Sequence, residues 1–266
     1  MKNKKQIIFI VAVFLLLVFI ASYISKNTDS SQQGAVAVKP GTSAVYVVNA
    51  GSSTLFRSLN DGHEINGKWY IYFAASEVDN IWKLRPYVLE CKGQNPLKDE
   101  WVELGQMQPA DGDNKSFIDF SLDGTVFENN EKRYFCWAEK TGGQFAASNL
   151  YLAEMESPIK LKTPQFMLST PDYDWERIDF WVNEGPAVLK NKGKIYITFS
   201  ASATGACYCM GLMEADEDAD LLDRNSWKKS RYPVLETDYE KKIYGPGHNS
   251  FTVAEDGVTP LSIYHA

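Results

Sequence analysis

The sequence predicts an all-β protein built as a β-propeller, and two observations support this prediction. The first is an internal repeat of strand-like segments that begin at residues 67, 131 and 193, each directly after a turn signal. The second is that the 266-residue chain has no convincing amphipathic helix beyond its N-terminal segment. Repeats of about 60 residues, each containing a hairpin and further strands, are typical of propeller blades.

The repeated segments cover residues 67–76, 131–140 and 193–202 and align without gaps, at offsets of 64 and 62 residues. A partial fourth copy follows, because Gly257 lies 64 residues after Gly193. We expect a strand before each turn, at residues 124–128, 186–190 and 250–255, and outer strands at 101–106, 164–168 and 231–235. A β-sandwich is the competing architecture, but it would not normally show such a period.

The N-terminus predicts export. Three lysines precede an unbroken apolar run from Ile7 to Ala21, which is the pattern of a signal peptide or a short signal anchor. We assign residues 1–25 to this segment, residues 26–62 to a Ser-, Thr- and Gly-rich linker, and residues 63–266 to the propeller. The expected location is extracellular, periplasmic or anchored at the cell surface, with membrane contact only through an uncleaved N-terminal segment.

Composition restricts the partners. The net charge of −7 and the lack of a basic patch beyond the extreme N-terminus argue against a nucleic-acid partner. Aromatic residues reach 13%, which suits both strand packing and stacking on sugar rings. The four cysteines have an irregular spacing that indicates buried free thiols rather than a disulfide framework. They are Cys91, Cys136, Cys207 and Cys209.

Three polar residues stand just before the first strand of successive repeats: Asp123, Glu184 and His248. His248 lies 64 residues after Glu184, and Asp123 is one residue out of this register. Each also has a simpler interpretation, as a turn or cap residue beside glycine for the two acids and as a hydrogen-bonded turn histidine for His248. Because first strands converge near a propeller axis, we expect the three side chains to share one polar pocket.

A pair of acidic residues in such a pocket suits cleavage of a glycosidic bond. This reaction needs a protonated acid at the leaving oxygen, and inverting enzymes also need a carboxylate base. Trp181, close to Glu184 in sequence, favours a raised pKa for that carboxyl group and offers an aromatic surface for a sugar.

Four segments together resemble glycoside hydrolase family 43, and most closely its α-L-arabinofuranosidases. They are residues 67–75, 121–128, 180–189 and 244–251, and they occur in family order. The resemblance implies a five-bladed propeller, inversion, and action on arabinose- or xylose-containing plant polysaccharides such as arabinan and arabinoxylan. It implies that Glu184 is the general acid and that Asp123 tunes and orients it. Trp181 and His248 are then substrate-binding, and His248 corresponds to a channel histidine that often sits beside a cation, commonly calcium. No other cofactor is implied.

The chain also departs from the family pattern. Family members carry the general base as an aspartate, usually followed by proline, in the first blade, and no Asp-Pro dipeptide occurs here. The comparison implies an incomplete propeller, with the first blade missing and the last blade cut short. Asp61 is the nearest acid, but it matches no base motif. We therefore expect weak hydrolysis, with a catalytically inactive or vestigial carbohydrate-binding propeller as the alternative.

Overall fold

The computed structural model describes residues 54–77, 80–140 and 146–266. This part of the chain is all-β, as predicted, and two short 3-10 turns are its helical elements: η1 (Asp174–Glu176) and η2 (Arg224–Ser226). The strands are β1 (Thr54–Ile65), β2 (Lys68–Glu77), β3 (Asn80–Cys91), β4 (Trp101–Gln106), β5 (Ser121–Asn129), β6 (Lys132–Lys140), β7 (Ser148–Ser157), β8 (Lys160–Leu161), β9 (Phe166–Ser169), β10 (Asn183–Asn191), β11 (Lys194–Ala201), β12 (Cys209–Asp216), β13 (Lys228–Lys229), β14 (Gly247–Val253) and β15 (Pro260–His265).

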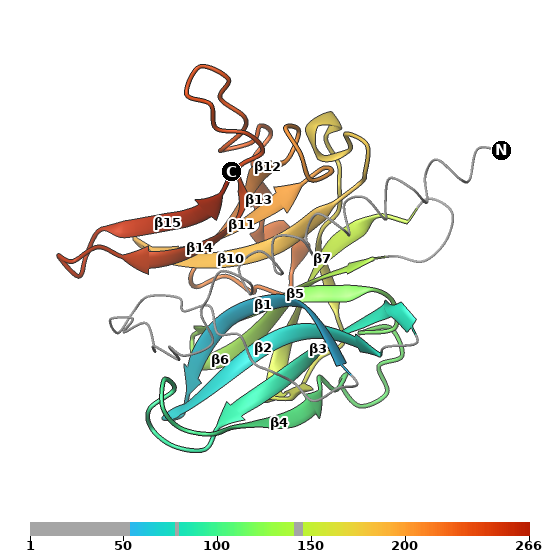
Figure 1. Cartoon of the computed structure of the whole chain (residues 1–266), viewed down its shortest axis with the longest axis vertical. Coiled ribbons are helices and arrows are strands. Elements are labelled where there is room, and N and C mark those ends of the chain that lie inside the picture. The colour runs from blue at the N-terminus through green and yellow to red at the C-terminus, as the bar shows by residue number, and fades with distance from the viewer. Residues whose placement is uncertain (1–53, 78–79, 141–145) are drawn as a thin grey trace, which may run out of the picture. The chain divides into compact units, whose positions relative to one another are not determined.

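The strands form four antiparallel sheets in chain order (Figure 1). The first contains β1 to β4, the second β5 to β9, the third β10 to β13, and the fourth the hairpin β14–β15. In the second sheet both β8 and β9 pair with β7. Each sheet is therefore a local meander, which explains why one repeat in the sequence corresponds to one sheet.

The turn signals of the sequence form the first hairpin of each of the first three sheets. In each turn the two central residues have positive φ angles, as in the type I′ turns that match strand twist. The pairs are Asn66 and Gly67 at 53° and 77°, Asn130 and Glu131 at 49° and 61°, and Lys192 and Gly193 at 50° and 74°. Each pair contains at least one asparagine or glycine, the residues that enter this region at low cost, so these hairpins are specified locally.

Apolar side chains from neighbouring sheets pack against each other. One buried cluster joins the first sheet to the second, with Tyr72 facing Phe135 across it. A second cluster joins the second sheet to the third through residues such as Leu152 and Ile197. The first strands also contact in sequence, β1 with β5, β5 with β10 and β10 with β14. The sheets are thus joined side by side along the chain, with their first strands adjacent.

Three boundaries differ from those expected from the sequence. β1 begins at Thr54, so residues 54–62 belong to the first sheet and not to a linker. The first strands of the later sheets begin at residues 121, 183 and 247, three residues earlier than expected, because a bulge lets the pairing continue past the glycines. Residues 231–235 form no outer strand; Lys228–Lys229 pairs with β12 instead, and Leu235 makes only an isolated bridge.

The four cysteines carry free thiols, as predicted. Cys91, Cys136 and Cys209 are buried, whereas Cys207 is only partly buried. In the described ranges no helix has the length and hydropathy needed to cross a membrane. The predicted export segment and most of the predicted linker lie outside the described residues.

Candidate active site

A β-bulge recurs at the same place in the first strand of every sheet. In each case two residues of the first strand stand opposite one residue of the second strand. The bulged pairs are Asn60–Asp61, Asp123–Gly124, Gly185–Pro186 and His248–Asn249. The residue opposite each bulge is aromatic: Tyr72, Trp137, Phe199 and Tyr264. Bulges redirect side chains, and this repeated bulge collects the polar residues singled out by the sequence.

The pairing corrects the expected register of these residues. Asp123, Gly185 and His248 occupy the first bulge position and have positive φ angles of 53°, 56° and 47°. Glu184 comes one residue before its bulge and remains paired, opposite Ser200. Asp123 and His248 are therefore the equivalent pair, and Glu184 stands one residue before the equivalent position. His248 falls level with Glu184 along the sequence because the β14–β15 turn is longer and the β14 bulge lies one residue closer to its turn.

The bulges of β5, β10 and β14 meet at one place. The fully buried carboxylate of Asp123 accepts a hydrogen bond from the Gly185 main-chain N–H through Oδ2, at 3.1 Å. Its Oδ1 lies 3.8 Å from Nε2 of His248. Gly185 lies flat against the His248 ring, because a Cβ atom there would come within 3.2 Å of the imidazole. Asp123 and His248 thus approach each other beside the backbone of Glu184.

Glu184 has the electrostatics of a proton donor. Burial, and next the negative charge of Asp123, raise the pKa of its carboxyl group to about 7. The hydroxyl of Tyr208 donates to Glu184 Oε1 at 2.7 Å, and this bond together with His248 acts in the opposite direction on the pKa. Glu184 therefore keeps its proton at a higher pH than an ordinary glutamate does. A carboxyl group with such a pKa can give up its proton and take up another from water near neutral pH.

A buried glutamate holds the segment that leads into β5. Glu139 accepts hydrogen bonds from three consecutive main-chain N–H groups, those of residues 117–119, and from the indole of Trp137. Arg85 donates to the carbonyl oxygens of Ile118 and Asp119 from the other side. This clamp fixes the approach to Asp123 by charge-assisted hydrogen bonds.

A second buried glutamate holds the entry to β10. Glu176 is fully buried, forms an ion pair with Lys229 at 2.5 Å, and accepts from Asn183 Nδ2 at 2.9 Å. The Lys229 ammonium also donates to the Thr170 carbonyl oxygen and lies over the Phe199 ring. Because Asn183 precedes Glu184, this network fixes the backbone that carries Glu184.

Trp181 lies apart from these contacts. Its side chain is 50% exposed and packs against the guanidinium of Arg177, 4.6 Å from the ring centroid. The aromatic residue that touches the Glu184 carboxyl group is Tyr208, for which no signal is visible along the sequence. Tyr208 lies 24 residues further along the chain, between two cysteines and outside every family-like segment.

The described residues do not fit a calcium site. Calcium takes six to eight oxygen ligands, whereas His248 offers a ring nitrogen and Asp123 is engaged with Gly185. No group of three or more histidine, cysteine, aspartate or glutamate side chains suited to a metal ion gathers in the described part of the chain.

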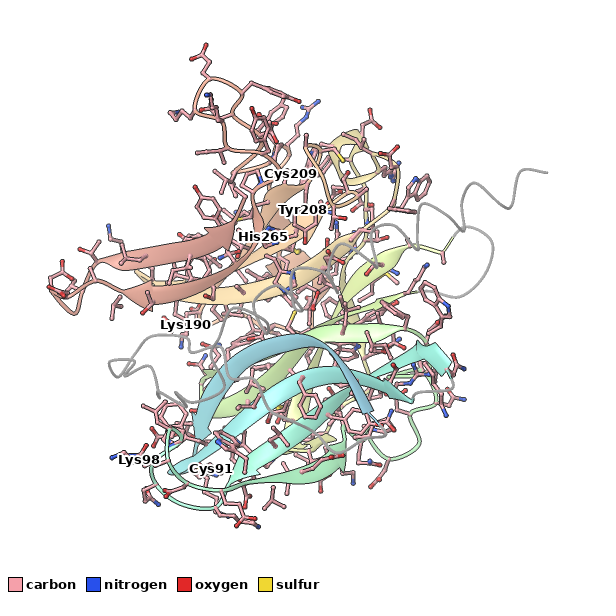
Figure 2. The ribbon with its side chains drawn as sticks, viewed as in Figure 1. Cys91, Lys98, Lys190, Tyr208, Cys209 and His265 are labelled. Atoms are coloured by element: carbon pink, nitrogen blue, oxygen red, sulfur yellow. The ribbon has the colours of Figure 1, made fainter. Side chains whose placement is uncertain are left out.

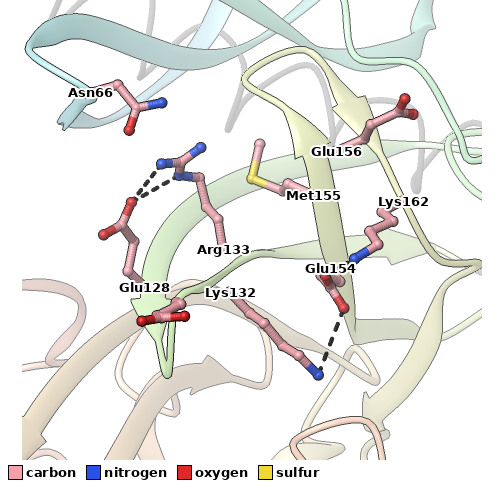
Figure 3. Close-up of a pocket in the computed structure, with 9 residues that line it drawn as sticks. Asn66, Glu128, Lys132, Arg133, Glu154, Met155, Glu156 and Lys162 are labelled. Atoms are coloured by element: carbon pink, nitrogen blue, oxygen red, sulfur yellow. Dashed lines mark hydrogen bonds and ion pairs between the residues drawn. The ribbon is translucent and has the colours of Figure 1, made fainter.

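A separate polar pocket of about 510 Å³ lies at the turn end of the first two sheets (Figure 3). Its charges pair with one another: Arg133 with Glu128 at 2.6 Å, and Lys132 and Lys162 with Glu154 at 4.0 and 2.5 Å. No aromatic residue lines it. The residues that line this pocket include none of Asp123, Glu184 and His248.

Comparison with known proteins places this geometry in a family. The family model described as glycosyl hydrolases family 43 matches residues 60–266, and the chain belongs to this family. It is similar to an extracellular exo-α-(1→5)-L-arabinofuranosidase of Streptomyces chartreusis, with 46% identity over 204 residues, 77% of this chain and 60% of that protein. It is also similar to α-L-arabinofuranosidase 43 of Humicola insolens, with 43% identity over 76% of this chain and 41% of that protein.

Solved structures agree with this relationship. The crystal structure of an α-L-arabinofuranosidase from Lactobacillus brevis matches with a TM-score of 0.73 and 46% identity, covering 80% of this chain and 67% of that one. A thermostable family-43 glycoside hydrolase matches with a TM-score of 0.64 and 27% identity, covering 79% of this chain and 65% of that one. The chain thus spans about 60% or less of the curated relatives and about two thirds of these structures.

Proposed function

We propose that this chain is an inverting glycoside hydrolase that acts on α-L-arabinofuranosides, with Glu184 as its general acid. One observation carries the proposal: Glu184 lies next to the buried carboxylate of Asp123, which is bonded to the Gly185 main-chain N–H, and this arrangement raises the pKa of Glu184. The names of the relatives from Streptomyces chartreusis and Humicola insolens support the choice of sugar.

In this proposal the four sheets are consecutive blades of a five-bladed propeller. The described residues would supply an incomplete set, without the first blade and with only two strands in the last. The side-by-side first strands and the packing between neighbouring sheets support this arrangement. The bulges of three blades then form one pocket near the axis.

Each site residue has a distinct role in the reaction. Glu184 delivers its proton to the leaving oxygen. Asp123 keeps that proton bound at neutral pH by its negative charge, and its bond to the Gly185 N–H holds the backbone next to the acid. Trp181 and His248 are the proposed substrate-binding residues. The half-exposed Trp181 ring offers a stacking surface, and the His248 side chain retains 35% exposure.

The general base is the catalytic role that the described residues fill least well. An inverting enzyme places its base roughly 6.5–9.5 Å from the acid, on the far side of the sugar. The carboxylate that acts on Glu184 in the described part of the chain is Asp123, which is already the orienting residue. We therefore propose slow hydrolysis, since a positioned base is worth about 10²–10⁴-fold in rate. The β1 backbone puts Asp61 in the first bulge, so Asp61 is the first substitute to test.

The alternative function is a catalytically inactive or vestigial carbohydrate-binding propeller. The lack of an Asp-Pro dipeptide anywhere in the 266 residues favours it, because family members usually carry their base in that motif. A carbohydrate-binding propeller would bind arabino-oligosaccharides without turning them over.

The proposed setting is outside the cytoplasm, on the basis of the lysine-flanked apolar run at the N-terminus. The Streptomyces chartreusis relative is itself named extracellular. The proposed partners are arabinan, arabinoxylan or oligosaccharides derived from them, and no nucleic acid. Membrane contact would be limited to an uncleaved N-terminal segment. The chemistry uses carboxyl groups and water and requires no cofactor.

The test is turnover of an aryl α-L-arabinofuranoside and an aryl β-D-xyloside by the purified chain. We expect slow hydrolysis of the arabinofuranoside, weaker hydrolysis of the xyloside, and loss of both in Glu184→Gln. Glu103→Gln, at an exposed position of β4, is the matched control and should behave as the parent chain. Binding of arabino-oligosaccharides without turnover would favour the alternative. Unchanged turnover in Glu184→Gln would refute the assignment of the acid.

A further inference from the structure

We propose that Tyr208 is a positioning residue that determines which oxygen of Glu184 carries the proton to be delivered. The inference rests on the proposed role of Glu184 as general acid. It arises from a chain of hydrogen bonds that links three sites: the β14 bulge, Ser200 on β11 and the acid on β10.

The direction of this chain is set at its first link. The main-chain N–H of His248 can only donate, and it donates to Ser200 Oγ at 2.7 Å. That fully buried hydroxyl also forms a side-chain hydrogen bond with Tyr208, and this bond acts to lower the pKa of Tyr208, as a donated hydrogen does. The single Ser200 hydrogen therefore goes to Tyr208 Oη. The single Tyr208 hydrogen then goes to Glu184 Oε1, at 2.7 Å.

Packing holds the Tyr208 ring in this position. The side chain is 2% exposed, and the ring of His265 stacks on it with centroids 5.7 Å apart and planes 14° apart (Figure 2). Gly247 makes the close approach possible, because a Cβ atom there would lie 2.5 Å from Tyr208 Cε1 and 2.9 Å from Ser200 Oγ. The Tyr208 main-chain N–H is also bonded to the Gly205 carbonyl oxygen. The hydroxyl therefore has little freedom to leave the acid.

In this arrangement the two carboxyl oxygens of Glu184 have different functions. Oε1 is occupied by a donated hydrogen whether Glu184 is charged or neutral, so the acid's own proton stays on Oε2. After the proton leaves, the same Tyr208 hydrogen bond stabilises the carboxylate. The other ionisable groups that face this cluster are Asp123 on β5, His248 on β14 and His265 on β15. Asp123 favours the neutral acid and Tyr208 favours the charged one, so the two tune the acid in opposite senses.

The experiment follows the titration of Glu184 directly, by carbon-13 NMR of the full chain labelled at glutamate carboxyl groups. The Glu184 signal is assigned by its loss in Glu184→Gln. We expect Tyr208→Phe to raise the pKa of Glu184 by about 1–2 pH units, since a hydrogen bond to a charged group is removed. Tyr72→Phe is the matched control. Tyr72 is also fully buried, but it donates to the Pro158 carbonyl oxygen in the first two sheets, so its loss should leave the Glu184 titration unchanged.

A second variant changes the hydrogen bond in the other direction. Site-specific 3-fluorotyrosine at position 208 makes the hydroxyl a stronger donor with almost no change in volume, and should lower the pKa of Glu184. A Glu184 pKa within about 0.3 units of the parent in both position-208 variants would overturn the proposal. If Tyr208→Phe fails to fold, the fluorotyrosine variant alone decides. Because the titration needs no turnover, shifted pKa values in a chain that never hydrolyses arabinofuranosides would refute the proposed function and keep this inference.

Discussion

The raised pKa of Glu184 predicts a measurable stability change on substitution by glutamine. An acid whose pKa is higher in the folded chain than in the unfolded chain contributes stability that is present below its ordinary pKa. That stability is lost as the pH rises through the folded value. The folded value is about 7 against an ordinary 4.5, so the ionised side chain costs about 3 kcal/mol above neutral pH. Glutamine resembles the neutral acid and does not carry this cost.

The size of the effect follows from the contacts. The glutamine side chain of the variant would keep an oxygen for the Tyr208 hydroxyl. Its amide N–H groups would lower the stability of the folded chain by up to about 1 kcal/mol if they found no hydrogen-bond acceptor. Glu184→Gln should therefore stabilise the chain by about 2–3 kcal/mol near pH 8, a rise in Tm of roughly 5–10 °C. Near pH 5 the difference should fall below about 1 kcal/mol, because the folded parent is then almost fully protonated.

The assay is urea or thermal unfolding of the parent chain, Glu184→Gln and the exposed control Glu103→Gln at the two pH values. Taking the difference between parent and variant cancels other groups that titrate in this range, including the histidines. A Glu184→Gln variant that is no more stable than the parent near pH 8, or equally stabilised at both pH values, would refute the reasoning. It would show that the carboxyl group titrates normally.

Three further predictions concern the residues around the acid. Lys229→Met should lower the free energy of unfolding by about 3–5 kcal/mol in urea titrations, because it leaves the buried Glu176 carboxylate without its cation. Gly247→Ala should cost about 1–3 kcal/mol in the same assay, since its methyl group would overlap the Tyr208 ring. Partial desolvation of the exposed His265 ring, and next the charge of His248, lower the pKa of His265, so its contribution is present above its ordinary value of 6.5 and lost as the pH falls. His265→Phe should therefore lose less stability than the parent on acidification, measured as Tm against pH.

Each of these three predictions has a control variant or a result that would contradict it. Adding Glu176→Gln to Lys229→Met should restore part of the loss, and no restoration would show that the ion pair is not the cause. Gly62→Ala is the control for Gly247→Ala, because the nearest atom to a Cβ there is 3.9 Å away; equal losses would contradict the steric explanation. Identical pH profiles for the parent and His265→Phe would exclude the histidine contribution.

Local features of the fold could be predicted from the sequence. The hairpins at Asn66–Gly67 and Lys192–Gly193 depend on two residues that adopt positive φ, so a short window contains the information. The repeat then extends that information to whole sheets. The prediction of an outer strand at 231–235 was wrong, because pairing at a sheet edge depends on what the neighbouring strand offers, and β12 pairs with Lys228–Lys229.

Only part of the candidate site could be predicted from the sequence. Asp123, Glu184 and His248 stand beside glycines in repeated positions, which is a pattern visible along the chain. The bulge register that brings them together was not visible, because it depends on pairing between strands. Tyr208 and Glu176 were missed for the same reason. Each acts through contacts with residues in other elements, and neither carries a local signature.

The most direct test of the general-acid role compares leaving groups. A leaving group that departs readily as an anion needs no proton, whereas a sugar alcohol does. We therefore expect Glu184→Gln to lower kcat/KM by about 10²–10⁴-fold on an arabinobioside but far less on a 2,4-dinitrophenyl arabinofuranoside. Equal losses on the two substrates, or no loss on the arabinobioside, would contradict the assignment of Glu184 as the proton donor.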